Sequence, residues 1–122
     1  MAERYSSFQP GSTLWLLQRV TAAFLVVTLA FHFFLLHFYN HAPEITLQGS
    51  AGRMDVPVYF VTMILFLATA AFHGVNGVYN ALVNAGLDGT PKAVVKWGLI
   101  VAGLALVGQG IRLAVALAGV SA

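Results

Sequence analysis

Three long apolar runs decide what this chain can fold into. They extend from Val20 to Phe38, from Val56 to Leu82 and from Trp97 to Val120. Each is long enough to cross a bilayer as a helix, which takes about 20 apolar residues. Of 122 residues, 59% are hydrophobic and only 8% are charged, so polar residues could not cover the apolar surface of a soluble fold. We predict an all-α membrane protein, a single transmembrane domain over residues 1–122 with helices at about 13–40, 56–84 and 92–119.

The segments between the runs predict the connections. Ser12 or Thr13 can cap the first helix. Residues 39–55 hold a proline, two glycines and three charges, which is typical of an exposed loop. Residues 86–91 (GLDGTP) predict a tight turn. The polar residues 1–11 are too few for a cleaved signal peptide. A polar loop without a small-residue cleavage site follows the first run, so we expect that run to remain as a permanent span.

Positive charges favour the cytoplasmic side of a membrane and so predict the orientation. With the N-terminus inside, the outer loop carries one cation, Arg53. The inner face carries four cations: Arg4, Arg19, Lys92 and Lys96. We therefore expect a cytoplasmic N-terminus and a periplasmic C-terminus.

Composition also excludes several classes of function. The chain has no cysteine, which rules out disulfides, thiolate-held clusters and covalent haem attachment. It has no run of basic residues that would indicate a nucleic-acid surface.

Two histidines lie inside the apolar runs, where hydrocarbon cannot solvate an imidazole. His73 is followed by Gly77 on the same helix face, which would give a porphyrin room beside an axial ligand. A hydrogen bond from His73 to a carbonyl or a neighbouring helix is the alternative. His32 is five residues before His37, about 140° around the helix, so these two point to different faces.

His32 and His73 are expected to lie at different depths in the bilayer. His32 lies ~9 Å on the outer side of the middle of its span, and His73 lies roughly 4–5 Å on the inner side of its own. A separation of about 13 Å is too large for one iron. If both bind haem, they bind two different haems, each of which needs a second axial ligand from a partner chain.

Arg19 and several glycines complete the candidate residues. The Arg19 guanidinium could pair with haem propionates, whose carboxylates suit its donor fork, or it could be an interfacial arginine that reaches toward water. Five glycines leave flat surfaces for close helix packing or for a planar ligand: Gly74, Gly77, Gly103, Gly108 and Gly110.

A family resemblance rests on two short patterns and the topology. The first helix carries Trp15, Arg19, Thr21 and Ala22 in the order W-x3-R-V-T-A, and the second carries His73, Asn76 and Gly77. Together with three helices in about 120 residues, this resembles the membrane-anchor subunits of succinate dehydrogenase (complex II), and the likeness is greatest to the hydrophobic anchor of that complex. The cytochrome b556 subunit usually has His-Arg-x-[Ser/Thr]-Gly where this chain has residues 18–22 (QRVTA).

The resemblance implies roles for particular residues. It implies that His73 is an axial ligand of a haem b held between two anchor chains, in half of a haem-binding helix bundle. His32 matches the helix-one histidine that holds a second haem in two-haem members, and Arg19 matches an arginine near the haem propionates and the quinone site. In the family, Asp-Tyr often follows the haem histidine by eleven and twelve residues, and that tyrosine hydrogen-bonds the quinone. Asn84 and Ala85 stand there instead, so the tyrosine is missing.

The function that the resemblance implies is that of an anchor in a bacterial succinate:quinone oxidoreductase of the cytoplasmic membrane. Its partners would be a second anchor (cytochrome b) subunit, an iron–sulfur subunit, a flavoprotein subunit, membrane lipid and the substrate quinone. One haem b, or two, would be shared with the second anchor. The chain itself has no succinate-oxidising site. An anchor of quinol:fumarate reductase and a non-redox structural membrane subunit are the alternatives.

Overall fold

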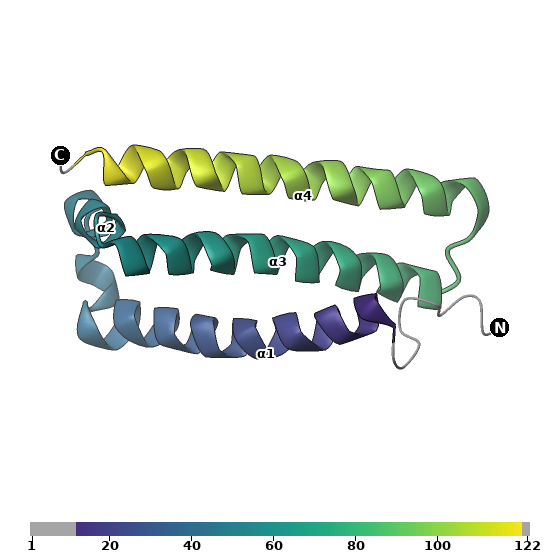
Figure 1. Cartoon of the computed structure of the whole chain (residues 1–122), viewed down its shortest axis with the longest axis horizontal. Helices are drawn as coiled ribbons and strands as arrows, with labels where there is room; N and C mark the ends of the chain where they lie inside the picture. The colour runs from purple at the N-terminus through teal and green to yellow at the C-terminus, as the bar shows by residue number, and fades with distance from the viewer. Residues whose placement is uncertain (1–11, 121–122) are drawn as a thin grey trace.

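The computed structural model describes residues 12–120 of the chain. The expectations for residues 1–11, including the absence of a cleaved signal peptide and the inner position of Arg4, lie outside the described residues. Three long helices, α1, α3 and α4, form the body of the molecule, and a short helix α2 lies at one end of it (Figure 1).

Helix α1 covers Thr13–Phe34 and continues as a π-helical segment, Leu35–Tyr39. The Ser12 side chain accepts a hydrogen bond from the Trp15 amide at 3.1 Å, which confirms one of the two predicted caps. At the other end, the Asn40 side-chain amide donates to the Leu35 carbonyl at 3.0 Å. Together the two segments form one apolar stretch of 27 residues, Thr13–Tyr39.

The connection between α1 and α3 is more ordered than an exposed loop, and the prediction for residues 39–55 was wrong in this respect. It contains a 3-10 turn, Ala42–Glu44, and helix α2, Leu47–Met54. The Thr46 hydroxyl caps α2 by accepting a hydrogen bond from the Gly49 amide at 3.1 Å. Ala51 of α2 is fully buried, because α2 packs against both α3 and α4. The glycines of this segment therefore lie within a helix and do not break it.

Helices α3, Pro57–Asn84, and α4, Gly89–Ala118, are joined by a short turn. Gly86, at φ 106°, ends α3: its amide donates to the Val83 carbonyl, and the Leu87 amide donates to the Leu82 carbonyl. The Asp88 side chain then accepts a hydrogen bond from the Gly89 amide at 2.8 Å, and α4 begins there. This start is three residues earlier than predicted, because a proline is tolerated in the first helical turn, where amide protons have no partner within the helix.

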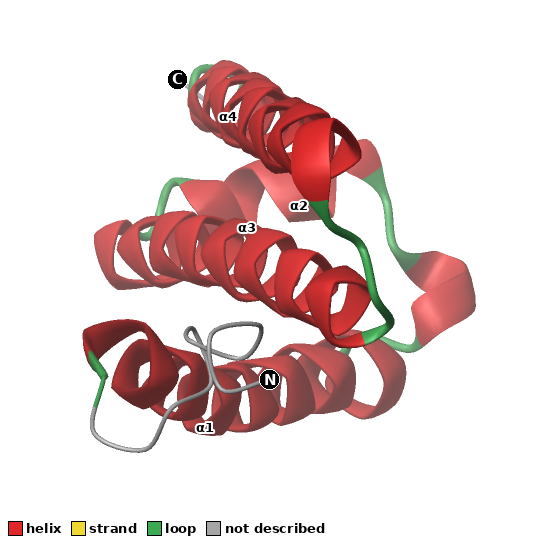
Figure 2. Ribbon diagram, turned by 90° about the vertical axis from the view of Figure 1, so that its right-hand side faces the viewer, coloured by secondary structure: helices red, strands yellow, loops and turns green. Residues whose placement is uncertain are grey.

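Helix α3 lies between α1 and α4, as both views show (Figures 1 and 2). Few side chains of the described chain are buried: Thr28, Ala51, Met63, Ala71, Asn80, Val83 and Ala114. Large apolar side chains are exposed along all three long helices, for example Val27, Val58 and Leu104, each at least 68% exposed. Such a surface suits lipid and partner helices. The predicted all-α fold with three helices able to span a membrane is confirmed.

The packing of α3 on α4 depends on two glycines of α4. A Cβ atom on Gly103 would lie 2.8 Å from a methyl group of Val75, and one on Gly110 would collide with Leu67. Apart from the neighbouring backbone of the same helix, no heavy atom lies within 4 Å of the positions that Cβ atoms would take at Gly74 and Gly108. Between α3 and α4, the expected role in close helix packing therefore belongs to Gly103 and Gly110.

Candidate functional site

His73 faces α1 and contacts Thr21. The Nδ1 atom of His73 lies 3.0 Å from the Thr21 hydroxyl oxygen, and both side chains are half-buried. The Thr21 hydroxyl donates its own proton to the Leu17 carbonyl at 2.7 Å, so its oxygen is left to accept from the imidazole. A proton on Nδ1, with the lone pair on Nε2, is compatible with this arrangement. That tautomer, held by a second contact, suits an imidazole that binds a metal through Nε2.

Gln18 joins the two helices beside the same imidazole. Its Nε2 atom donates to the His73 carbonyl at 3.2 Å and lies 3.4 Å from His73 Nε2. Its Oε1 atom accepts a hydrogen bond from Asn76 at 2.7 Å. Asn80, which is only 3% exposed, in turn donates to Oδ1 of Asn76 at 3.0 Å. These amides therefore satisfy one another in a part of the protein where an unpaired polar group would be costly.

The side-chain amide of Gln18 occupies the space next to Gly77. A Cβ atom there would lie 3.1 Å from Nε2 of Gln18. Gly77 thus makes room for the Gln18 amide on the α1 side of α3, whereas the sequence led us to expect room for a porphyrin.

A cavity of about 180 Å³ lies next to His73. It is lined by one face of α1 and by the imidazole, through Trp15, Gln18, Arg19, Ala22 and His73. The four α1 residues follow the i, i+3, i+4, i+7 spacing of a single helix face. The cavity is too small to enclose a tetrapyrrole, so this chain would line only one edge of such a group.

Arg19 lies over the indole of Trp15, with its guanidinium carbon 4.3 Å from the ring centroid. The contact holds an exposed guanidinium at the wall of the cavity that His73 also lines. From the sequence, Trp15 stood out only as part of the W-x3-R-V-T-A pattern. The structure gives it this contact with Arg19.

The residues at this cavity fit a haem. They comprise an imidazole, a hydroxyl oxygen 3.0 Å from its Nδ1 atom and a guanidinium whose fork suits carboxylates. His73 and Arg19, predicted separately from the sequence, are brought together here.

His32 is not part of this cluster. Its ring stacks on Phe66 of α3 with centroids 6.1 Å apart, and its Nδ1 atom is buried without a hydrogen-bond partner. Phe66 precedes His73 by seven residues, which places the two histidines roughly 10 Å apart along α3. His37 is exposed and stacks on Phe33 instead, at 4.1 Å, so it faces away from His32 as predicted.

The positions where the family carries Asp-Tyr lie at the end of α3. Asn84 is its last residue, Ala85 is its cap, and both are exposed. Neither lines the cavity beside His73.

Sequence reasoning missed the structural importance of Gln18, Asn76 and Asn80. Asn76 and Asn80 follow His73 by three and seven residues, so all three lie on one face of α3. Polar side chains on one face of an apolar span need partners within the protein, and this was the signal that could have found them.

The comparisons with known proteins agree with this architecture. A statistical model of the family described as succinate dehydrogenase/fumarate reductase transmembrane subunit matches residues 2–112. No curated protein and no solved structure gives a significant match. The chain is a multi-pass membrane protein with three helices able to span the bilayer, and it belongs to the succinate dehydrogenase/fumarate reductase transmembrane subunit family.

Proposed function

We propose that this chain is a membrane anchor of a bacterial succinate dehydrogenase and binds haem b together with a second anchor subunit. It would lie in the cytoplasmic membrane with its N-terminus inside. There it would help electrons pass from the iron–sulfur subunit to quinone. The single observation that supports haem binding best is the 3.0 Å contact between Thr21 and Nδ1 of His73, because a proton on Nδ1 would leave the lone pair of Nε2 for iron.

Each residue of the cluster has a part in this proposal. His73 would hold the haem iron through Nε2, and the second anchor subunit would supply a further ligand. Thr21 would fix the plane of the imidazole, and Arg19 would pair with propionate or quinone oxygens at the inner end of α1. The Gln18 amide, now 3.4 Å from His73 Nε2, would have to yield that position to iron. A bound haem b would supply a one-electron relay.

The remaining partners follow from family membership and charge. Family members associate with the other subunits of complex II, so we expect the iron–sulfur and flavoprotein subunits at the inner face. Lys92 and Lys96 of α4 would lie at the same face as Arg19 in the predicted orientation. Succinate oxidation would take place in the flavoprotein subunit.

His32 remains a candidate ligand of a second, outer haem. Its distance from His73 along the bundle requires a separate group, and its unpartnered Nδ1 would need an acceptor from the partner chain. The number of haems per flavin decides whether His32 binds a second haem. Two haems per flavin, falling to one in His32→Leu, would support a second haem, whereas one haem in the unmodified complex would make His32 a packing residue.

The proposed function is tested by the visible spectrum of the purified complex. A reduced-minus-oxidised spectrum with a b-type α-band, quantified per flavin, is expected. A colourless complex would favour the alternative of a non-redox structural subunit. An anchor of quinol:fumarate reductase would give the same spectrum, and the ratio of succinate oxidation to fumarate reduction by the complex separates it from a succinate dehydrogenase.

A further inference from the structure

A second cavity, of about 420 Å³, opens near the turn between α3 and α4. Its polar lining comes from three side chains: Asn76, Tyr79 and Lys96. The Asn76 amide already donates to Gln18 at 2.7 Å. The Tyr79 hydroxyl, the Lys96 ammonium and the second N–H of the Asn76 amide are therefore the donors that remain for a ligand.

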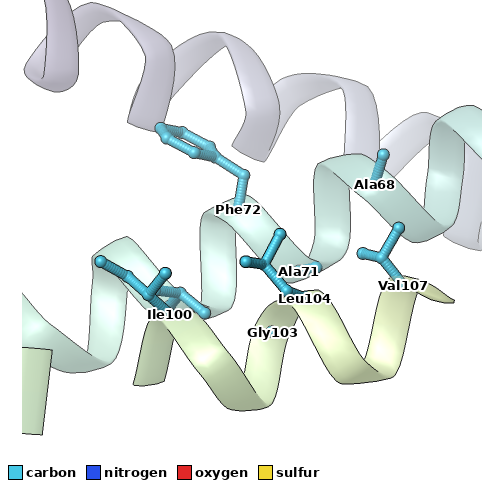
Figure 3. Close-up of a pocket in the computed structure, with 8 residues that line it drawn as sticks. Ala68, Ala71, Phe72, Ile100, Gly103, Leu104 and Val107 are labelled. Carbon is cyan, nitrogen blue, oxygen red and sulfur yellow. The ribbon is translucent and has the colours of Figure 1, made fainter. Parts of the chain in front are cut away.

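The rest of this cavity is apolar and continues into a groove of about 240 Å³ between α3 and α4 (Figure 3). Phe72, Val75 and Ile100 line both spaces. The groove continues to Ala68, eleven residues before Tyr79, which makes the whole site roughly 16 Å long. One end can thus hold a polar headgroup, and the remainder can hold a flexible apolar chain.

The positive charge of Lys96 at the polar end favours an anionic headgroup. Lys96 is exposed, and its described contact is with the Trp97 ring, 5.9 Å away. A compact ammonium that lines the same cavity as a phenolic hydroxyl attracts a phosphate more strongly than a neutral carbonyl. Lys96 is also in the second turn of a spanning helix, near the depth of lipid headgroups.

We infer that the cavity at Tyr79 and Lys96, with the α3–α4 groove, binds one anionic phospholipid by its phosphate and one acyl chain. The site does not require haem, and it is separate from the cavity beside His73. With the proposed orientation, the lipid belongs to the cytoplasmic leaflet.

Native mass spectrometry of the assembled complex, titrated with phosphatidylglycerol or phosphatidylcholine, tests this inference. One phosphatidylglycerol per copy of this chain should bind about fivefold more tightly than phosphatidylcholine, the effect of one favourable charge near a lipid surface. Lys96→Gln should abolish this preference. Lys92→Gln, which removes the same charge one turn away without lining the cavity, should keep it.

Three results would overturn the inference: equal binding of the two lipids, an equal loss in the two lysine variants, or displacement of the lipid by added ubiquinone, which would make this a site for a neutral ring. Tyr79→Phe provides a second variant that keeps the size and charge of the site. It should weaken phosphatidylglycerol binding severalfold, and unchanged binding in that variant would contradict the assignment of the hydroxyl.

Discussion

The hydroxyl oxygen of Thr21 lies 3.0 Å from Nδ1 of His73 and links α1 to the only histidine of α3. Because the hydroxyl proton is donated within α1, the contact favours a proton on Nδ1 and orients the imidazole. Partners of this kind typically change metal affinity 10–100-fold when they are removed.

Thr21→Val should therefore lower the haem content or haem affinity of the complex by about 10–100-fold, because the ring loses its acceptor while the shape of the side chain is kept. The measurement is haem per flavin, followed by haem titration of the depleted complex. Thr62→Val is the matched control, since the Thr62 hydroxyl bonds only its own helix, to Val58 at 2.7 Å. Equal haem binding in both variants would remove Thr21 from the site.

Gln18→Leu should destabilise the contact of α1 with α3 by about 1–3 kcal/mol, because it leaves the Asn76 amide without its acceptor. Resistance of the complex to unfolding in a denaturing detergent is the measurement. Gln18→Leu combined with Asn76→Leu should recover part of the loss, since both partners are then apolar. If the loss of stability in the double variant equals the sum of the losses in the two single variants, the two side chains do not act together.

Arg19→Ala should lower quinone reductase activity or the haem midpoint potential, while succinate oxidation by an artificial acceptor persists. A charge-assisted hydrogen bond is worth about 1.5–3 kcal/mol, or roughly tenfold or more in affinity. Arg19→Lys should restore only part of the loss, because an ammonium lacks the fork of donors. Arg112→Ala, an exposed arginine in the last third of α4, serves as the control. If Arg19→Ala matches that control in both assays, Arg19 contributes only to topology.

Gly103→Ala should destabilise the α3–α4 contact by about 1–3 kcal/mol, because its Cβ would lie 2.8 Å from a methyl group of the stiff Val75 side chain. Gly108→Ala has open space at the same position and should be neutral or slightly stabilising. Thermal unfolding of the complex measures both. Similar midpoints for the two variants would contradict the close approach at Gly103.

The sequence was sufficient for the three spanning helices because their apolar runs are long and nearly free of charge. It was insufficient for α2, since residues 47–54 have no apolar run and their helix depends on the Thr46 cap and on burial of Ala51 against α3 and α4. His73 and Arg19 could be selected because each is a polar group in an apolar span. The cavity that His73 and Arg19 share could not be predicted from the sequence. It depends on which face α1 turns toward α3, and the contacts of Gln18 and Thr21 determine that face.

The assignment of His73 as a haem ligand is tested by the spectrum of a complex that carries His73→Ala. We predict that the low-spin b-type haem of the inner site is lost while the chain remains inserted and the flavoprotein subunit still oxidises succinate with an artificial acceptor. The same bis-histidine spectrum and haem content in His73→Ala as in the unmodified complex would contradict the central claim that His73 is an axial ligand.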